Sequence, residues 1–413
     1  MRDISGPRIM HRLEQLARCS EEPEALTRTF LTDEHRAAGQ LLKGWMEEAG
    51  MRAGFDAIGN VVGRYEGSEP GLPALLVGSH YDTVRNAGKY DGMYGIVAGI
   101  ACVEALNERA ERLPFAIEVI GFADEEGVRF DATLLGSRAV AGTFDAGLLD
   151  KRDRNGVCMA DALRACGLDP AGIGQAAHRS DEVLAYVEAH IEQGPVLLHE
   201  ELPVGVVSAI AGATRFDVSV TGLAGHAGTV PMSLRRDAGA AAAEAVLSVE
   251  RRCAEVDGLV GTVGQLAVPD GATNVVPGRA TLSLDVRSGD DSVREAAVRD
   301  ILAELDTIAA RRNVRFDVRK THDAPAASCA PWLMDQLEAA IARSGFAPRQ
   351  LLSGAGHDAM ALPALTDIAM LFVRCGNGGI SHHPDETMTG ADAELGAAVL
   401  LDFIRHFDWQ RTL

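Results

Sequence analysis

Short apolar runs alternate with helical patterns in the first half of the chain. Residues 73–80 and 115–122 are apolar stretches, and residues 95–111 between them carry apolar side chains at helical spacing with a charged end. This β-α-β rhythm predicts an α/β domain with a mostly parallel sheet and helices on both faces. In such sheets ligands bind beyond the carboxyl ends of the strands. The polar clusters that follow both apolar runs fall at such ends.

The pattern of apolar and polar positions changes near residue 211. From there to residue 325, four strand-like and two helical runs follow one another in the order β-α-β-β-α-β, typical of a ferredoxin-like unit. The strand-like runs are 215–222, 259–268, 278–288 and 314–322, and the helical runs are 234–256 and 290–312. We therefore expect two domains: one formed by residues 1–210 and 326–413, and a ferredoxin-like (βαββαβ) domain at 211–325 inserted into it.

Length, composition and net charge exclude several classes of protein. The chain has 413 residues, 47% apolar and 24% charged, which is typical of a globular protein of two or three domains. Its net charge of −20 argues against nucleic acid and anionic membranes as partners. The amphipathic pattern of residues 1–24 lacks the apolar stretch of a signal peptide, and the seven scattered cysteines are typical of reduced thiols. We expect a soluble, cytoplasmic protein.

Several polar residues that follow apolar runs are of the types that bind divalent metals. They are His80, Asp91, Glu126, His190, and His382 or His383. Zinc and its neighbours take imidazole nitrogen and carboxylate oxygen, and a catalytic site keeps one position open for water. Five ligands serve two metals, roughly 3.5 to 4 Å apart, if Asp91 is shared. A lone histidine near a strand end is more often structural, but four separate segments end in such residues here.

Two further carboxylates accompany the candidate ligands. Asp82 lies two residues after His80, and metal-bound imidazoles usually donate their second ring N–H to a carboxylate or a carbonyl. Glu125 and Glu126 are adjacent, so at a strand end they point in roughly opposite directions. One can bind metal while the other faces the substrate and moves a proton between water and a leaving nitrogen. Taken alone, residues 124–126 favour a solvated acidic turn.

Nine motifs in order along the chain resemble the aminoacylase and carboxypeptidase G superfamily of dinuclear metallohydrolases. More narrowly, they resemble its branch of allantoate amidohydrolases and N-carbamoyl-L-amino acid hydrolases. The motifs run from residue 78 to residue 386 and are "GSHYDTVRNAGKYDG", "DEEGVRF", "LGSRAVAG", "AHIEQGPVL", "GHAGTVPM", "TNVVPG", "DVRSGDD", "SGAGHDAM" and "GISHHPDE". The resemblance implies a homodimeric hydrolase with two divalent metal ions per subunit (zinc or manganese, with cobalt or nickel as further options). It would cleave the terminal ureido group of a small carboxylate.

The resemblance also assigns roles to the candidate ligands. It implies that His80 and His190 hold one metal, that Glu126 and His382 hold the other, and that Asp91 bridges them. The family places the last ligand four residues before the glutamate of "S-H-x-P-x-E", which selects His382 over His383. Two further residues have implied catalytic roles: Glu125 as general acid and base, and Asp82 as the partner of His80.

Residues of both domains would reach the substrate according to the resemblance. They are Gln193, Arg215, His226, Asn274, Arg287, Gly356 and His357. Arg287 offers a fork for the substrate carboxylate, and His226 could donate to the oxygen that gains charge during catalysis. In this family, the residues that match His226, Asn274 and Arg287 typically reach the substrate from the partner subunit, through a lid or dimerisation domain. Without the resemblance, pairing of Arg287 with Asp285 or Asp290, and capping of its own turn by His226, are the favoured interpretations.

The substrate is the least determined feature. The stretch "DTVRNAGKYDG" looks more like the allantoate enzymes than the "DTQPTGGKFDG" type of the carbamoylases, so we expect allantoate. N-carbamoyl-L-amino acids and N-carbamoyl-β-alanine are the alternative substrates. Remoter alternatives are a peptidase or aminoacylase on the same scaffold, and a binding protein without chemistry. The last is disfavoured because the five ligands and Glu125 are all retained.

Overall fold

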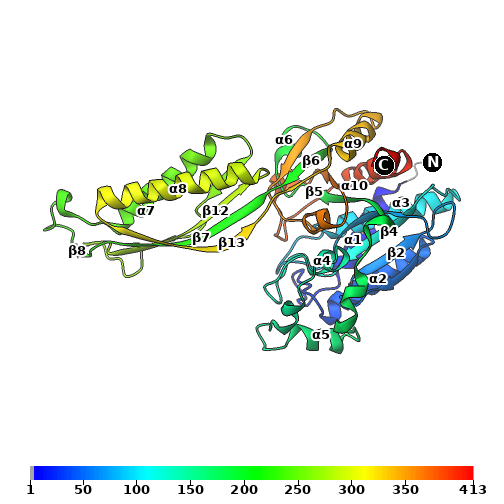
Figure 1. The fold of residues 1–413 in the computed structure, drawn as a ribbon, viewed down its shortest axis with the longest axis horizontal. Helices are drawn as coiled ribbons and strands as arrows, with labels where there is room; N and C mark the ends of the chain where they lie inside the picture. The colour runs from blue at the N-terminus through cyan, green and yellow to red at the C-terminus, as the bar shows by residue number, and fades with distance from the viewer. Residues whose placement is uncertain (1–3, 413) are drawn as a thin grey trace. The chain divides into compact units, whose positions relative to one another are not determined.

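The computed structural model describes residues 4–412 and divides into two compact units. Unit 1 comprises Met1–Ser208, Cys329–Leu351 and Ala355–Leu413, and unit 2 comprises Ala209–Ser328 and Leu352–Gly354. The ribbon in Figure 1 shows a sheet with helices in each unit. No helix among the described residues is both long and apolar enough to span a bilayer.

The larger sheet has nine strands in the order β1-β2-β4-β3-β5-β16-β6-β14, with β15 pairing to β6. The strands are β1 (Arg52–Phe55), β2 (Val61–Tyr65), β3 (Ala74–His80), β4 (Ala116–Phe122), β5 (Val183–Ile191), β6 (Val204–Ile210), β14 (Ala327–Ser328), β15 (Gln350–Ser353) and β16 (Ile368–Val373). The four central strands β4, β3, β5 and β16 are parallel, whereas antiparallel pairings join β1 to β2, β2 to β4, β6 to β16 and β14 to β6. The prediction of an α/β fold with a mostly parallel sheet is thus confirmed for the central strands. The antiparallel strands beside them were not predicted.

Helices cover both faces of this sheet. The helices of unit 1 are α1 (Gly6–Ala17), α2 (Asp33–Glu48), α3 (Met93–Glu108), α4 (Leu135–Val140), α5 (Met159–Ala165), α6 (Val196–His199), α9 (Pro331–Arg343) and α10 (Gly390–Arg405). A side chain at Gly99 of α3 would meet Val119 of β4, and one at Gly136 of α4 would meet Phe122 of the same strand. Since Val119 and Phe122 point to opposite faces, α3 and α4 lie on opposite sides. Residues 93–103 of α3 are all buried because α1 and α10 cover the helix from outside.

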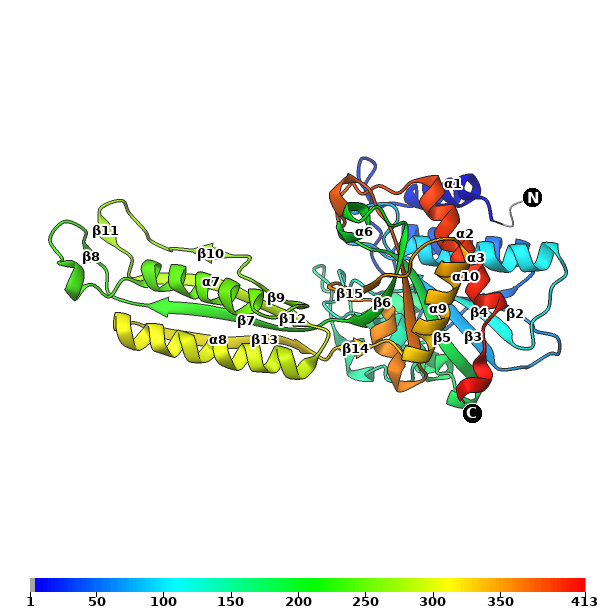
Figure 2. The same ribbon diagram turned by 90° about the horizontal axis from the view of Figure 1, so that it is seen from above.

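Unit 2 is built on an antiparallel sheet. Its main elements in chain order are β7 (Gly212–Thr221), α7 (Ala238–Ala254), β9 (Leu259–Thr262), β12 (Arg279–Ser288), α8 (Asp291–Arg312) and β13 (Arg315–Ala324). β7 and β12 pair along their whole length, β13 adds to β7, and β9 and the short β10 (Leu266–Ala267) add to β12. The helices α7 and α8 lie side by side over one face, as Figure 2 shows, and bury an aliphatic core against the sheet. A separate two-stranded ladder joins β8 (Gly225–His226) to β11 (Val275–Val276).

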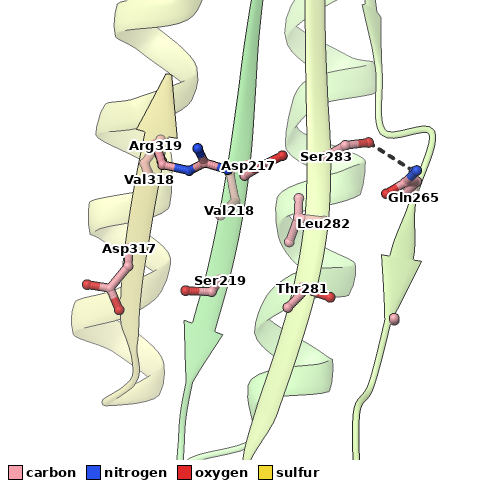
Figure 3. A pocket seen from close by; sticks show the side chains of 11 residues that line it. Asp217, Val218, Ser219, Gln265, Thr281, Leu282, Ser283, Asp317, Val318 and Arg319 are labelled. Atoms are coloured by element: carbon pink, nitrogen blue, oxygen red, sulfur yellow. Dashed lines mark hydrogen bonds and ion pairs between the residues drawn. The ribbon is translucent and has the colours of Figure 1, made fainter. Parts of the chain in front are cut away.

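The other face of the unit 2 sheet is polar. Val218 is buried on the helix side, so its neighbours Asp217 and Ser219 point to the opposite face. Figure 3 shows Asp217 beside Arg319, with which it forms an ion pair, and the backbone N–H of Gln265 donating to the Ser283 hydroxyl over 3.0 Å. Among residues 4–412, none that lines this shallow groove is a predicted site residue. We interpret the groove as a solvated sheet face.

A charged network at the edge of the larger sheet gives a prediction about stability and pH. Glu118 of β4 accepts hydrogen bonds from Arg64 (2.8 Å) and His178 (2.7 Å). The hydrogen bond to Glu118 raises the pKa of His178, so its stabilisation is complete below the unfolded pKa of about 6.5 and is lost as the pH rises through the folded pKa. His178→Gln is expected to lower the free energy of unfolding by roughly 1.5 kcal/mol at pH 6 and by less at pH 9. Urea unfolding of both proteins at the two pH values measures this, and an equal loss at both would contradict it.

Candidate metal centre and active site

The structure brings the predicted ligands together in unit 1. His80 ends β3, Asp91 precedes α3, Glu126 follows β4, His190 lies near the end of β5, and His382 follows β16. The strands β4, β3, β5 and β16 are neighbours and run parallel, so their carboxyl ends meet at one edge of the sheet. The ligands converge there because each lies at the carboxyl end of one of these strands or in the segment that follows it.

Asp91 lies at the centre of the cluster. Its Oδ1 is 3.2 Å from Nε2 of His190 and 3.5 Å from Nε2 of His80, whereas its Oδ2 is 3.1 Å from Nε2 of His382. Nε2 of His382 is also 3.5 Å from Oε1 of Glu126. Two groups of ligand atoms, each within 4.8 Å of one another, therefore share Asp91: one with His80 and His190, the other with Glu126 and His382. Each carboxylate oxygen of Asp91 faces a different group.

The glycine that follows Asp91 is required by the packing. Gly92 has φ +72°, a left-handed conformation that favours glycine, and a side chain there would lie 2.5 Å from the His80 ring. Its backbone N–H donates to Nε2 of His190 over 3.1 Å. The turn can therefore pass directly beneath both imidazoles and place Asp91 between them.

Hydrogen bonds on Nδ1 orient the two buried imidazoles. Nδ1 of His80 lies 3.2 Å from the carbonyl oxygen of Asp82 and 3.5 Å from its Oδ1, and Nδ1 of His190 lies 2.8 Å from the carbonyl oxygen of Ile191. Carbonyl oxygens only accept hydrogen bonds, so Nδ1 carries the proton in both rings. Nε2 is then the unprotonated ring nitrogen and lies on the side of Asp91, which is the arrangement that metal-binding histidines use; in His190 it also accepts the Gly92 N–H.

Asp82 connects His80 to the acidic pair. The carboxylate is 1% exposed, and its two oxygens accept the backbone N–H groups of Glu125 (3.0 Å) and Glu126 (3.2 Å). One buried side chain therefore holds the end of β3 against the segment after β4. This geometry matches the positioning role that the resemblance implies for Asp82.

Glu125 has the properties of a general base. Burial raises its pKa to about 7, and the neighbouring carboxylates of Asp82 and Asp91 add to this effect. A carboxyl group whose pKa is near neutral can both accept and return a proton at physiological pH. Gly356 lies beside it, because a side chain at this position would be 3.4 Å from Oε1 of Glu125. The structure thus brings the Gly356 backbone next to the predicted base.

The two adjacent histidines have different surroundings in the structure. His382 faces Asp91 and Glu126, and its hydrogen bond to Asp91 raises its pKa to about 9. His383 instead accepts the backbone N–H of Asp385 over 3.1 Å through Nδ1. His382 has φ +55°, a backbone conformation that few residues other than glycine adopt. This turn directs His382 towards the cluster.

The donor set fits divalent metals. Burial alone would raise the pKa of Asp91, but the neighbouring imidazoles of His190, His382 and His80 hold it well below its usual value. Burial and the charges of Asp91 and Glu125 raise the pKa of Glu126 well above its usual value. Such crowding of carboxylates is relieved by a bound cation, and mixed imidazole and carboxylate ligands suit zinc and similar ions.

Two other residues predicted to reach the substrate lie close to the cluster. The side-chain amide of Gln193 donates to Oδ2 of Asp91 (3.0 Å) and to the hydroxyl of Ser381 (3.1 Å). His357 is 1% exposed, and its ring lies edge-on to that of His190 with 4.5 Å between centroids. His357 therefore packs against the ring of a predicted metal ligand.

The predicted substrate residues of unit 2 form two groups. Arg287 donates to both oxygens of Asp285 (2.8 and 3.0 Å) and to the carbonyl of Gly354 (2.6 Å), and Arg215 donates to the same carboxylate over 2.8 Å. The pairing of Arg287 with Asp285, expected without the resemblance, is therefore present. In the β8–β11 ladder, Nδ1 of His226 accepts the N–H of Gly228 over 3.0 Å, which is the expected turn cap.

Asn274 directly precedes β11 and lies next to His226. Its backbone carbonyl accepts the N–H of Ala227 over 2.9 Å, and Val275 is the ladder partner of His226. The side chains of His226 and Asn274 are both exposed. The structure brings these two residues to the same end of unit 2.

Buried polar residues around the cluster were not predicted. Glu188 is fully buried and accepts hydrogen bonds from Ser79 and from the N–H of Ala359. Arg28 is fully buried and donates to the carbonyl of Tyr81 over 2.6 Å. No local pattern marks either residue. Glu386 belongs to the motif "GISHHPDE", so its fixed distance from His382 was a signal that could have identified it.

Comparison with known proteins identifies the family to which the chain belongs. Residues 76–406 match the model of peptidase family M20/M25/M40, so the chain belongs to this family of metal-dependent hydrolases. The resemblance identified from the motifs is thereby confirmed, and so is the prediction of an enzyme that hydrolyses carbon–nitrogen bonds.

Similar proteins carry two kinds of name. An N-carbamoyl-L-amino acid amidohydrolase of Geobacillus stearothermophilus is 41% identical, with 98% of each chain aligned. A probable allantoate deiminase of Oryza sativa subsp. japonica is 40% identical over 98% of this chain and 89% of its own length. The crystal structure of an amidase of the hydantoinase/carbamoylase family from Burkholderia multivorans matches with a TM-score of 0.91 and 31% identity, over 97% of both chains.

Proposed function

We propose that the chain is a two-metal amidohydrolase that cleaves the terminal ureido group of a small carboxylate, with allantoate as the preferred substrate. The observation that carries the proposal is Asp91, whose two oxygens face two separate ligand groups. N-carbamoyl-L-amino acids are the second candidate, because relatives with either name are almost equally similar, at 41% and 40% identity. The preference for allantoate rests on the stretch "DTVRNAGKYDG".

The five candidate ligands, all in unit 1, would together hold two metal ions. His80 and His190 would hold one divalent ion, Glu126 and His382 the other, and Asp91 both; zinc or manganese suits this set, as do cobalt and nickel. When bound, such ions activate a water molecule and polarise the carbonyl that is attacked.

Glu125 would carry the proton. Its carboxylate takes a proton from water, whose oxygen joins the ureido carbon, and returns it to the nitrogen when the C–N bond breaks. Ammonia leaves, and the remaining carbamate yields carbon dioxide and an amine. A pKa of about 7 suits both transfers, because neither protonation state of Glu125 is strongly favoured at physiological pH.

For residues 211–325 we propose an inserted ferredoxin-like lid and dimerisation domain. The chain order β7-α7-β9-β12-α8-β13 supports the fold. Arg287 would bind the substrate carboxylate, Arg215 would add a second cation, and His226 and Asn274 would reach a substrate in the partner subunit of a cytoplasmic homodimer. Two guanidinium groups share the single carboxylate of Asp285, so this cluster carries an excess positive charge that suits an anionic substrate.

Metal analysis and a substrate panel test the proposal. Protein purified without chelators is expected to contain two metal ions per chain and to release ammonia from allantoate. Chelation should abolish turnover, and added zinc or manganese should restore it, because bound ions activate the water from which Glu125 would take a proton. Release of ammonia only from N-carbamoyl-L-amino acids or N-carbamoyl-β-alanine would select the second candidate. Turnover of dipeptides or acylamino acids alone would contradict both.

A further inference from the structure

A buried hydrogen-bond ring joins three of the ligand-bearing segments. Its centre is Glu386, which is 3% exposed. Oε1 of Glu386 accepts the backbone N–H groups of Tyr90 (2.8 Å) and Asp91 (3.2 Å), and its Oε2 accepts the hydroxyl of Ser381 over 2.6 Å. One carboxylate therefore holds the backbone of Asp91 and the residue that directly precedes His382.

Gln193 closes the ring. Its amide nitrogen lies 3.1 Å from the Ser381 hydroxyl and 3.0 Å from Oδ2 of Asp91. The connections run from the Asp91 backbone through Glu386, Ser381 and Gln193 back to the Asp91 carboxylate. Since Gln193 lies three residues after His190, the segments that carry Asp91, His190 and His382 are all tied to one another.

Two residues of the segments joined by the ring have backbone conformations that residues other than glycine disfavour. Gln193 and His382 have φ of +54° and +55°, in the left-handed region that side chains other than glycine disfavour. The loop before Asp91 also packs closely on the same carboxylate, because a side chain at Gly88 would lie 2.2 Å from the carboxyl carbon of Glu386. Without these hydrogen bonds, nothing local in the chain would favour the two left-handed turns.

We propose that Glu386 is a positioning residue that sets the distance between Asp91 and His382 before a metal binds. This inference rests on the metal site in the proposed function. Glu386 is a member of neither group of ligand atoms. It acts through the Asp91 backbone on one side and through Ser381 on the other, so its loss should affect metal affinity more than folding.

Zinc binding by the metal-free full-length chain tests the proposal. In competition with a chelating indicator, Glu386→Ala is expected to weaken Zn²⁺ binding by about 10- to 100-fold, as for other residues that orient metal ligands. Glu386→Gln should keep most of the affinity, because its amide oxygen can accept the two N–H groups and its NH₂ group can donate to Ser381. Glu21→Ala is the matched control: Glu21 accepts the N–H and hydroxyl of Thr29 and should not affect zinc affinity when removed.

The Tm of each metal-free variant, and its rise on adding Zn²⁺, separates positioning from general stability. Glu386→Ala should show a smaller rise than the wild type, whereas Glu21→Ala should show the same rise from its own starting point. If Glu386→Ala does not fold, Ser381→Ala, which removes only a hydroxyl group, should weaken zinc binding by about 10-fold. Unchanged affinity in the folded variants would overturn the inference, whereas absence of zinc binding by the wild type would overturn the proposed function.

Discussion

Replacing Glu125 with glutamine is expected to lower kcat by roughly 10³-fold while the metal content stays unchanged. Glutamine has nearly the same shape but cannot take a proton from water or return it to the leaving nitrogen. The contacts that hold this segment survive, because Asp82 accepts the backbone N–H of residue 125 rather than its side chain. Ammonia release under steady-state conditions and metal analysis of the same preparation measure the two effects.

The neighbouring residue supplies the control for this experiment. Glu126 lies in the ligand group with Asp91 and His382, so Glu126→Gln should lose metal as well as activity. The pair of variants distinguishes a proton carrier from a ligand at adjacent positions. Turnover of Glu125→Gln within tenfold of the wild type would rule out Glu125 as the base, and loss of metal from it would make it a ligand.

The positions of the candidate ligands could be predicted because each follows a simple pattern. His80 is the last residue of the buried strand β3, and Glu126 follows the buried strand β4, so their placement at a sheet edge follows from the alternation of strands and helices. The choice of His382 over His383 came from the family motif, since both histidines have the same chemistry. The structure adds the reason, which is the left-handed turn at His382.

Other contacts could not be predicted because they join distant parts of the chain. Glu386 accepts the N–H of Tyr90, a residue 296 positions earlier, and no periodicity in either segment indicates this pairing. The contact between Arg215 and Asp285 depends on the register of β7 and β12, which places the two residues directly opposite each other. A pattern of alternating residues predicts both strands but not which side chains face each other.

The same limit explains why the antiparallel strands at the sides of the larger sheet were not predicted. Parallel and antiparallel edge strands of four or five residues have similar composition, and β1 and β2 are joined by a turn that only the structure shows to be a hairpin. The central strands were easier to predict, because strands buried on both faces are continuously apolar. β3, β4 and β16 are buried along their entire length.

Asp91→Ala is expected to remove both metals and to lower kcat/KM by roughly 10³-fold or more, about 4 kcal/mol of transition-state stabilisation. The reason is the shared carboxylate: Oδ1 faces His80 and His190 while Oδ2 faces His382. Removing it leaves each group with only two of its three protein ligands. Metal stoichiometry and activity should be measured on protein equilibrated with the same free zinc concentration as the wild type.

Glu126→Ala separates a shared ligand from one that serves a single ion. It should lose only the metal held with His382, because His80, His190 and Asp91 remain intact. The expected stoichiometries are two ions per chain for the wild type, about one for Glu126→Ala, and fewer than one for Asp91→Ala. If Asp91→Ala still held one ion firmly, Asp91 would belong to one group only, and the His80 and His190 pair would need another carboxylate. Among the described residues, Glu188 lies beside His190, where it accepts hydrogen bonds from Ser79 and Ala359, and Glu125 and Glu126 lie beside His80, so that outcome would assign the remaining ligand to one of these three.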